Sequence, residues 1–386
     1  MPLNTPQHFD GAANIMKSLV DWLHRLATVT PEDGPEIGFF RVSVSGTDPL
    51  DIGNWLLSID PQGLLSNSLQ ATGPESWSVM RLPDLPRIEA SVHDRHRLGA
   101  DLACVLSLAL DRRVVVSNDI AMQIPQLEKV VFHPVSQVVD LGLLGPLPPD
   151  AKQRINAYIS SVAGLALGDQ EIIGAASSAY HGAILLFDRE PRAAYTLLVT
   201  GIEVLSRKYG SPPTGWTNWE DSSTWDRFFL EQDMTIGQAS AFRDRIMHDK
   251  QLRLAATFQD YASTRLREDF WDKPLDQWIY GIDANTGAWL PPTKVKASRV
   301  SDYLPLDRTT LKKSLGKTYS LRSLVVHEAH WVELMTLAQP PVNQPQGARI
   351  LPFPILRALL AELIWIEISA HALPTALPDF QLLRGK

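Results

Sequence analysis

Through most of the chain after residue 150, apolar residues recur every three or four positions, the spacing of one face of an α-helix. Pro191 suits the first turn of one such segment, because the N–H group that proline lacks would be unpaired there in any helix. The pattern predicts helices over 151–166, 169–189, 191–208, 236–248, 252–266, 308–327 and 351–372. We therefore expect this part of the chain to be a helical bundle.

The N-terminal part of the chain has a mixed pattern. Residues 10–28 and 96–111 carry apolar side chains at helical spacing. Short segments rich in aromatic and β-branched residues, which are typical of strands, lie between and after them. These segments are 36–45, 52–59, 76–81, 87–92 and 113–117. The pattern predicts an α+β region.

Prolines and a glycine between Leu144 and Asp150 would interrupt either kind of element. The predicted fold is therefore mostly α, with an α+β N-terminal domain over 1–148 and a helical domain over 149–386. Two stretches of the helical domain, 209–235 and 270–306, are rich in tryptophan and turn residues. We expect them to be irregular insertions over the helical core, with their tryptophans as packing anchors rather than platforms for stacked bases.

The composition is that of a globular protein: the chain has 386 residues, of which 45% are hydrophobic and 20% charged. A single cysteine, Cys104, excludes an intramolecular disulfide and fits a reducing compartment. The first residues lack the basic start and long apolar core of a signal peptide. The apolar segment 350–373 contains Arg357, Glu362 and Glu367, so it is expected to be a buried helix rather than a membrane span. These features predict a soluble, cytoplasmic protein.

The net charge of −7 argues against broad, nonspecific binding of nucleic acids. Between residues 291 and 327, however, eight Lys or Arg residues stand against two Asp residues. Lys312, Lys313 and Lys317 belong to this basic block and are candidates for contacts with RNA phosphates. A solvated helix face is the alternative interpretation of the same charges.

Near the end of this block, Arg322 and His327 are separated by four residues. A guanidinium can stabilise charge on phosphate oxygens, and an imidazole can transfer a proton near neutral pH. Together they could cleave a phosphodiester without a metal ion. A second match to the pattern is Arg243-Asp244 followed by His248, and we favour the Arg322 pair. No metal site or cofactor is expected, because His327-Glu-Ala-His330 lacks an evident third ligand.

The two helices around these residues resemble the Apea-like branch of the HEPN superfamily, over roughly residues 150–386. One helix carries Leu198 to Leu205 with Glu203, and the distal segment reads Tyr319-Ser-Leu-Arg-Ser-Leu-Val-Val-His327. The resemblance implies that Glu203 faces the motif helix and orients Arg322 or His327, with Tyr319 and Ser323 in support. Ser323 departs from the Asn, Asp or His that often follows the arginine in this superfamily. Without the resemblance, Glu203 could equally face water.

The resemblance implies that the protein is a metal-independent endoribonuclease. Two motif helices would meet in a homodimer, and the 2′-OH of RNA would attack the adjacent phosphorus, so DNA would not be cleaved. Such proteins suggest a role in bacterial antiphage or abortive-infection defence, or as a toxin, with the N-terminal domain as a sensing or regulatory part. The alternative function is a non-catalytic module that binds a nucleotide or a partner protein. A third interpretation is a scaffold in which Arg322 and His327 only form hydrogen bonds within the core.

Overall fold

The structure is a computed structural model. It describes residues 16–28, 37–45, 59–64, 75–83, 92–117, 140–146, 148–219, 221–248, 253–279, 283–286, 290–304, 306–327 and 349–373. Most of the described residues are helical, as the hydrophobic pattern predicted. Among them, no helix is long and apolar enough to cross a lipid bilayer.

Except for α6, which lies in a stretch expected to be irregular, the helices agree closely with the predicted ranges. They are α1 (Lys17–Thr28), α2 (Val92–Leu110), α3 (Ala151–Ala163), α4 (Leu167–Leu186), α5 (Pro191–Tyr209), α6 (Ser222–Glu231), α7 (Ile236–His248), α8 (Leu254–Arg265), α9 (Arg308–His327) and α11 (Phe353–His371). Pro191 lies in the first turn of α5, as predicted. Residues 10–15 of the first predicted helix lie outside the described residues.

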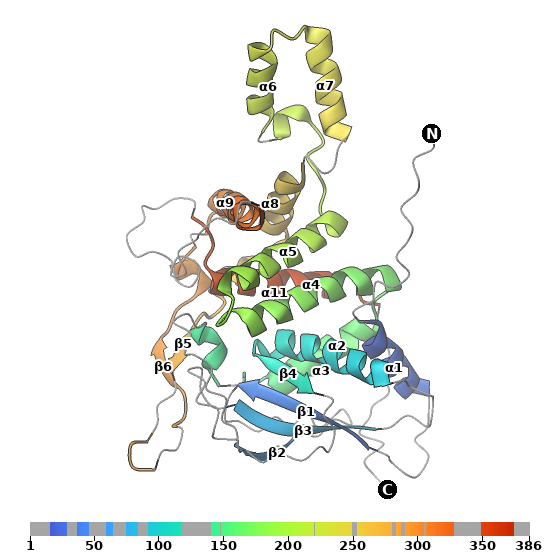
Figure 1. The fold of residues 1–386 in the computed structure, drawn as a ribbon, viewed down its shortest axis with the longest axis vertical. Coiled ribbons are helices and arrows are strands. Elements are labelled where there is room, and N and C mark those ends of the chain that lie inside the picture. The colour runs from blue at the N-terminus through green and yellow to red at the C-terminus, as the bar shows by residue number, and fades with distance from the viewer. Residues whose placement is uncertain are drawn as a thin grey trace.

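A four-stranded antiparallel sheet forms the lower layer of the molecule in Figure 1. Its strands are β1 (Ile37–Ser45), β2 (Ile59–Leu64), β3 (Glu75–Pro83) and β4 (Val114–Ser117), arranged β2-β3-β1-β4 with antiparallel neighbours. Most of the predicted strand 52–59 and all but the last residue of 87–92 lie outside the described residues, and residue 92 begins α2. The sheet lies against the layer of α1, α2 and α3.

The hydrophobic core is continuous across the expected domain boundary at residue 148. Buried residues of α1 and α2, such as Leu19 and Leu106, belong to the same core as Tyr180 of α4 and Leu360 of α11. Gly201 allows α5 to lie close to α11, since a Cβ there would be only 2.7 Å from a methyl group of Leu360. The described part of 1–148 is α+β, but its helices pack as part of the helical bundle.

The stretch 209–235 differs from the irregular insertion that we expected. It contains α6, which pairs with α7 in a helical hairpin that projects from the top of the molecule in Figure 1. Trp219 and Phe229 form a small core inside this hairpin, with Trp216 and Trp225 packed against it. These aromatic side chains pack between two helices, whereas composition alone suggested loops. The described residues of the second stretch, 270–306, form short elements: part of the 3-10 helix η4 (Glu268–Asp272), strands β5 (Gln277–Ile279) and β6 (Thr293–Lys296), and η5 (Val300–Asp302).

A buried ionic network joins the N-terminal residues to the C-terminal helix. Arg357 of α11 is 2% exposed, and its Nε donates to Asp140 Oδ2 at 2.8 Å. Its Nη1 donates to Asp111 Oδ1, which also accepts a hydrogen bond of 2.5 Å from the Tyr180 hydroxyl. Asp111 lies just after α2 and has a φ of 52°, a left-handed conformation that Asp and Asn tolerate better than most residues. Burial would raise the pKa of Asp111, but Arg357 outweighs it and holds that pKa well below the usual range.

The substitution Arg357→Met should destabilise the protein by about 3 kcal/mol, because it leaves the buried Asp140 and the partly exposed Asp111 without their counter-charge while keeping most of the packed volume. Urea unfolding at pH 7 measures the change. The control Arg299→Ala removes an exposed ion pair with Asp272 and should cost less than about 1 kcal/mol. Similar losses in the two variants would contradict a central role for Arg357.

The same network predicts a pH dependence of stability. A carboxyl group whose pKa is lower in the folded state stabilises the fold above its unfolded pKa of about 4, and this contribution declines as the pH falls below that value. Asp111→Asn keeps a residue that tolerates the left-handed backbone but cannot ionise. The stability advantage of the wild type over this variant should be full at pH 6–7 and shrink below about pH 4. Urea unfolding of both proteins across this range tests it, and a constant difference would contradict it.

Candidate functional site

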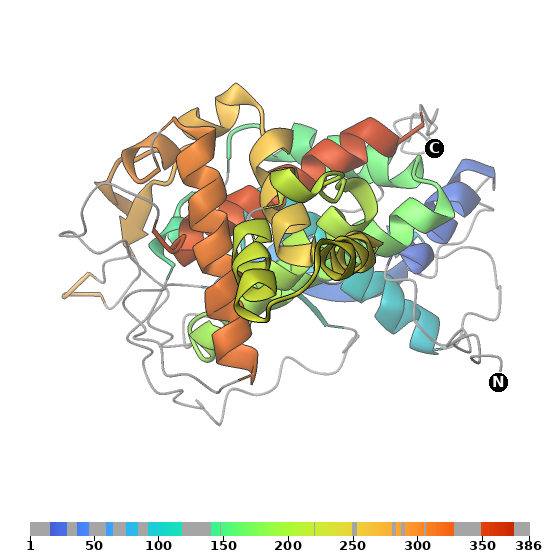
Figure 2. The ribbon, with the colours of Figure 1, turned by 90° about the horizontal axis from the view of Figure 1, so that it is seen from above.

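The candidate site lies where α9 packs against α5 and α8. Figure 2 shows α9, in orange, along the side of the bundle. Leu311, Leu315 and Leu321 form the buried side of α9, and Lys313 and Lys317 are exposed on the other side. This amphipathic pattern sets the rotation of α9 and so positions Arg322 on the flank that faces α5.

Glu203 is buried in α5, with 8% of its side chain exposed, and does not face water. Its Oε1 accepts a hydrogen bond of 2.5 Å from Nη2 of Arg207, one turn later on the same helix. Its Oε2 lies 3.7 Å from Nη2 of Arg322 on α9. The structure therefore brings together Glu203 and Arg322, which are far apart in sequence, with one carboxylate between two guanidinium groups.

The contact between Glu203 and Arg322 is an ion pair without a close hydrogen bond. Within the described residues, Glu203 Oε2 and Arg322 Nε are both buried and have no hydrogen-bond partner. Arg322 keeps 21% of its side chain exposed, so one end of the guanidinium is held by the carboxylate while part of the side chain reaches solvent. The buried Nε is out of reach of a ligand, so an anion could contact only the exposed part of this guanidinium.

Tyr319 and Ser323 flank Arg322 on α9. The Tyr319 ring packs on Phe258 of α8 at a centroid distance of 5.1 Å. Burial raises the pKa of Tyr319, and the negative charge of Glu203 raises it further against the opposite effect of Arg322. Tyr319 thus belongs to the same electrostatic group, with its hydroxyl protonated at neutral pH. Ser323 is partly buried next to Arg322.

His327 is the last residue of α9, and its side chain lies outside the described part of the structure. The backbone is regular helix from Arg322 to His327. Five positions of α-helix separate the two Cα atoms by about 7.5 Å along the axis and about 140° around it. The pairing of these two residues in one site stays a prediction.

The second candidate motif belongs to the projecting hairpin. Arg243 on α7 donates from Nε and Nη2 to Asp226 on α6, at 3.0 and 2.7 Å. Its guanidinium also lies over the rings of Trp216 and Phe229. His248 Nδ1 lies 2.7 Å from the backbone oxygen of the exposed Asp244. These contacts give Arg243 a structural role in joining α6 to α7, which favours Arg322 as the candidate for chemistry.

The three lysines proposed to contact RNA differ in their surroundings. Lys312 forms an ion pair of 2.7 Å with Asp260 on α8, so part of its charge is already balanced. Lys313 and Lys317 are exposed on α9. Among the residues that the structure describes, no group of three His, Cys, Asp or Glu side chains could hold a metal ion.

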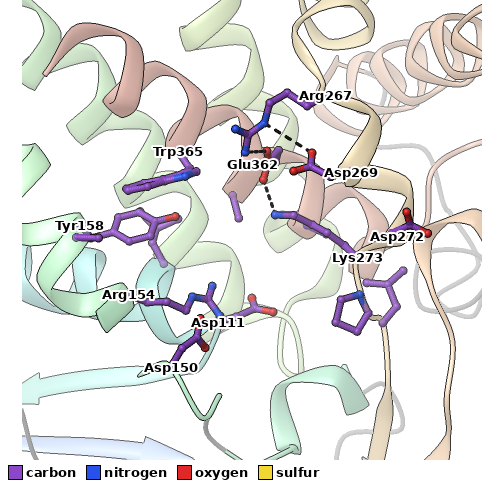
Figure 3. A pocket seen from close by; sticks show the side chains of 16 residues that line it. Asp111, Asp150, Arg154, Tyr158, Arg267, Asp269, Asp272, Lys273, Glu362 and Trp365 are labelled. Carbon is purple, nitrogen blue, oxygen red and sulfur yellow. Dashed lines mark hydrogen bonds and ion pairs between the residues drawn. The ribbon is translucent and has the colours of Figure 1, made fainter. Parts of the chain in front are cut away.

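Sequence reasoning missed a cavity on another side of the bundle, between α3 and α11 (Figure 3). Its side chains include Arg154 and Tyr158 from α3, and Trp365 from α11. A possible signal in the sequence was the spacing of four between Arg154 and Tyr158, which places both on one face of a helix. That spacing is too common to identify a site until α11 is known to lie opposite.

Comparison of the chain with protein-family models, with curated proteins and with solved structures gave no match.

The substitution Glu203→Gln should lower the free energy of unfolding by about 1–2 kcal/mol, because it removes the charge that holds two arginines at a buried position. Its control, Arg207→Gln, removes only the half-exposed partner and should cost less than about 1 kcal/mol. Urea unfolding of both variants measures the difference. Equal losses would mean that the contact with Arg322 contributes nothing to stability.

Proposed function

We propose that the protein is a metal-independent endoribonuclease in which Arg322 and His327 act on one phosphodiester. The observation that carries this proposal is the contact of Arg322 with the buried Glu203. The contact holds a partly exposed guanidinium in one place. A fixed cation stabilises the charge of a transition state better than a freely moving one. Glu203 is a positioning residue in this scheme.

The proposed reaction uses the nucleophile of the RNA itself. His327 accepts the proton of the 2′-OH as the oxygen attacks the adjacent phosphorus, and the bond from phosphorus to the 5′-oxygen breaks. The leaving oxygen takes up a proton, from the imidazolium or from water. The products are a 2′,3′-cyclic phosphate and a 5′-OH end. Arg322 stabilises the additional negative charge on the phosphate oxygens, and DNA is not a substrate because it lacks the 2′-OH.

The outward side of α9 supports an approach of RNA or of a second subunit. Lys313, Lys317 and Leu324 are exposed along it. In the proposed homodimer, two α9 helices meet so that each subunit contributes one Arg322 and one His327 to a shared cleft. The setting that we propose is a bacterial defence or toxin system, with residues 1–148 as a regulatory part.

A second candidate function is a non-catalytic module that binds a nucleotide or a partner protein. The observation in its favour is that Arg322 already has a carboxylate partner, so its charge is partly balanced before any substrate arrives. The net charge of −7 also disfavours strong binding of long RNA. The two candidates differ in whether RNA is cleaved.

The test is cleavage of single-stranded RNA by the purified protein in the presence of EDTA. The wild type should yield fragments ending in a 2′,3′-cyclic phosphate, and His327→Ala and Arg322→Ala should each reduce the rate by about 100-fold or more. Arg227→Ala, an exposed arginine on α6, is the control and should cleave like the wild type.

Arg243→Ala separates the two arginine motifs: it should weaken the α6–α7 hairpin and leave the cleavage rate of the folded protein nearly unchanged. Full activity of His327→Ala and Arg322→Ala would overturn the assignment. A folded wild type that binds mononucleotides but cleaves no RNA would establish the second candidate instead.

A further inference from the structure

The cavity between α3 and α11 has the dimensions of a small-molecule site. Its volume is about 560 Å³, and the segment from Arg267 to Leu275 closes one side of it. Leu108 and Asp111, at the end of α2, also line it. Ligand pockets in proteins commonly have volumes of about 300–1,000 Å³.

Two aromatic rings form one wall of the cavity. The rings of Tyr158 and Trp365 lie together with centroids 4.5 Å apart and planes tilted by 37°. In Figure 3 they lie on one side of the cavity, opposite Lys273 and Glu362. The small residues Ala157, Ala358 and Ala361 also line the cavity and leave space in front of the rings. Such a wall suits a planar, apolar body that can pack against aromatic faces.

Two hydrogen-bond donors in this cavity are unused within the described residues. The Tyr158 side chain is nearly enclosed, with the residue only 6% exposed, yet its hydroxyl has no hydrogen-bond partner there. Burial raises the pKa of Tyr158, so the hydroxyl stays protonated and can donate. The partly buried guanidinium of Arg154 likewise forms no hydrogen bond or ion pair with any described residue. Both side chains come from one face of α3, and Figure 3 shows them on the same side of the cavity.

The acceptors inside the cavity, in contrast, are already occupied. Glu362, with 3% of its side chain exposed, accepts from Lys273 at 2.5 Å and from Arg267 at 3.3 Å. Asp111 is bonded to Arg357 and Tyr180. Apart from the exposed Asp150, the unsatisfied groups are therefore donors, one of them cationic. A ligand that completes this site brings an acceptor with negative charge.

The rim limits how much negative charge the ligand carries. Asp150 lines the opening and is exposed, and Asp269 and Asp272 have side chains 68% and 73% exposed. Asp269 and Asp272 pair with Arg267 and Arg299, so their charge is partly balanced, but the three carboxylates together still disfavour polyanions such as nucleoside triphosphates or RNA. A single carboxylate, which matches the guanidinium in a bidentate pair, remains compatible with them.

We propose that the cavity between α3 and α11 binds a small planar organic monocarboxylate, with its carboxylate on Arg154 and the Tyr158 hydroxyl and its ring on Trp365. This site is separate from Arg322 and does not depend on ribonuclease activity. It is formed jointly by residues from 1–148 and from 149–386, so its occupant would contact both parts of the chain.

The test is isothermal titration calorimetry of the full-length protein with 2-naphthoate, the neutral isostere 2-naphthamide, and adenosine 5′-monophosphate. The naphthoate should bind with one site per chain and at least about tenfold more tightly than the amide, since only the carboxylate pairs with Arg154. Adenosine 5′-monophosphate, a dianion, should bind more weakly than naphthoate.

Arg154→Gln should weaken naphthoate binding by about tenfold or more, and Tyr158→Phe by about fivefold. Arg245→Gln, an exposed arginine on α7, is the control and should bind like the wild type. Circular dichroism and urea unfolding confirm that each variant is folded.

Three results would overturn the proposal. They are no detectable binding of naphthoate at about 1 mM, equal binding of the acid and the amide, or unchanged naphthoate binding by both folded α3 variants. Tighter binding of adenosine 5′-monophosphate that depends on Arg154 would assign the cavity to a nucleotide instead. None of these outcomes requires RNA cleavage, so the failure of one proposal is distinguishable from the failure of the other.

Discussion

The buried guanidinium of Arg357 is the constraint on which the arrangement of this protein depends. An arginine that is 2% exposed is costly unless carboxylates and hydrogen bonds offset its lost hydration. Both carboxylates come from the N-terminal part of the chain, Asp111 directly after α2 and Asp140 before the helical bundle. The charge of Arg357 on the C-terminal helix is therefore balanced by carboxylates from 1–148. This explains why the core is continuous across residue 148 although the sequence there is rich in prolines.

Two other arginines, each a candidate for contact with a ligand, differ in their surroundings. Arg322 is held by Glu203 but keeps a buried Nε without a partner among the described residues. Arg154 faces a cavity with no protein acceptor in the described structure, beside an aromatic wall. The first arrangement fixes a cation at the side of the bundle, where an extended phosphate chain can reach it. The second places a partly buried cation in an open cavity of small-molecule size. The two proposals are independent because these sites lie on different helices.

The projecting hairpin of α6 and α7 shows that a residue in a local sequence motif can also have structural contacts. Arg243 and His248 match the spacing that is associated with chemistry, and Asp244 follows the arginine. In the structure, Arg243 instead joins two helices through Asp226 and two aromatic rings. Its Nε and Nη2 donate within the hairpin, so part of its charge is already balanced. Spacing alone cannot distinguish these roles, because the partner of Arg243 is on another helix.

The sequence by itself determined the helices, because apolar periodicity is local: 236–248 and 308–327 were predicted with the bounds that the structure shows. It also predicted Arg322 and Glu203 as members of one site, through a family resemblance rather than through any calculation of contacts. Only the tertiary structure decided that Glu203 is buried against Arg322, and that Arg154 and Trp365 line the same cavity. A helical pattern specifies which face is apolar, but the partner of a polar side chain on its flank depends on how helices distant in sequence pack together.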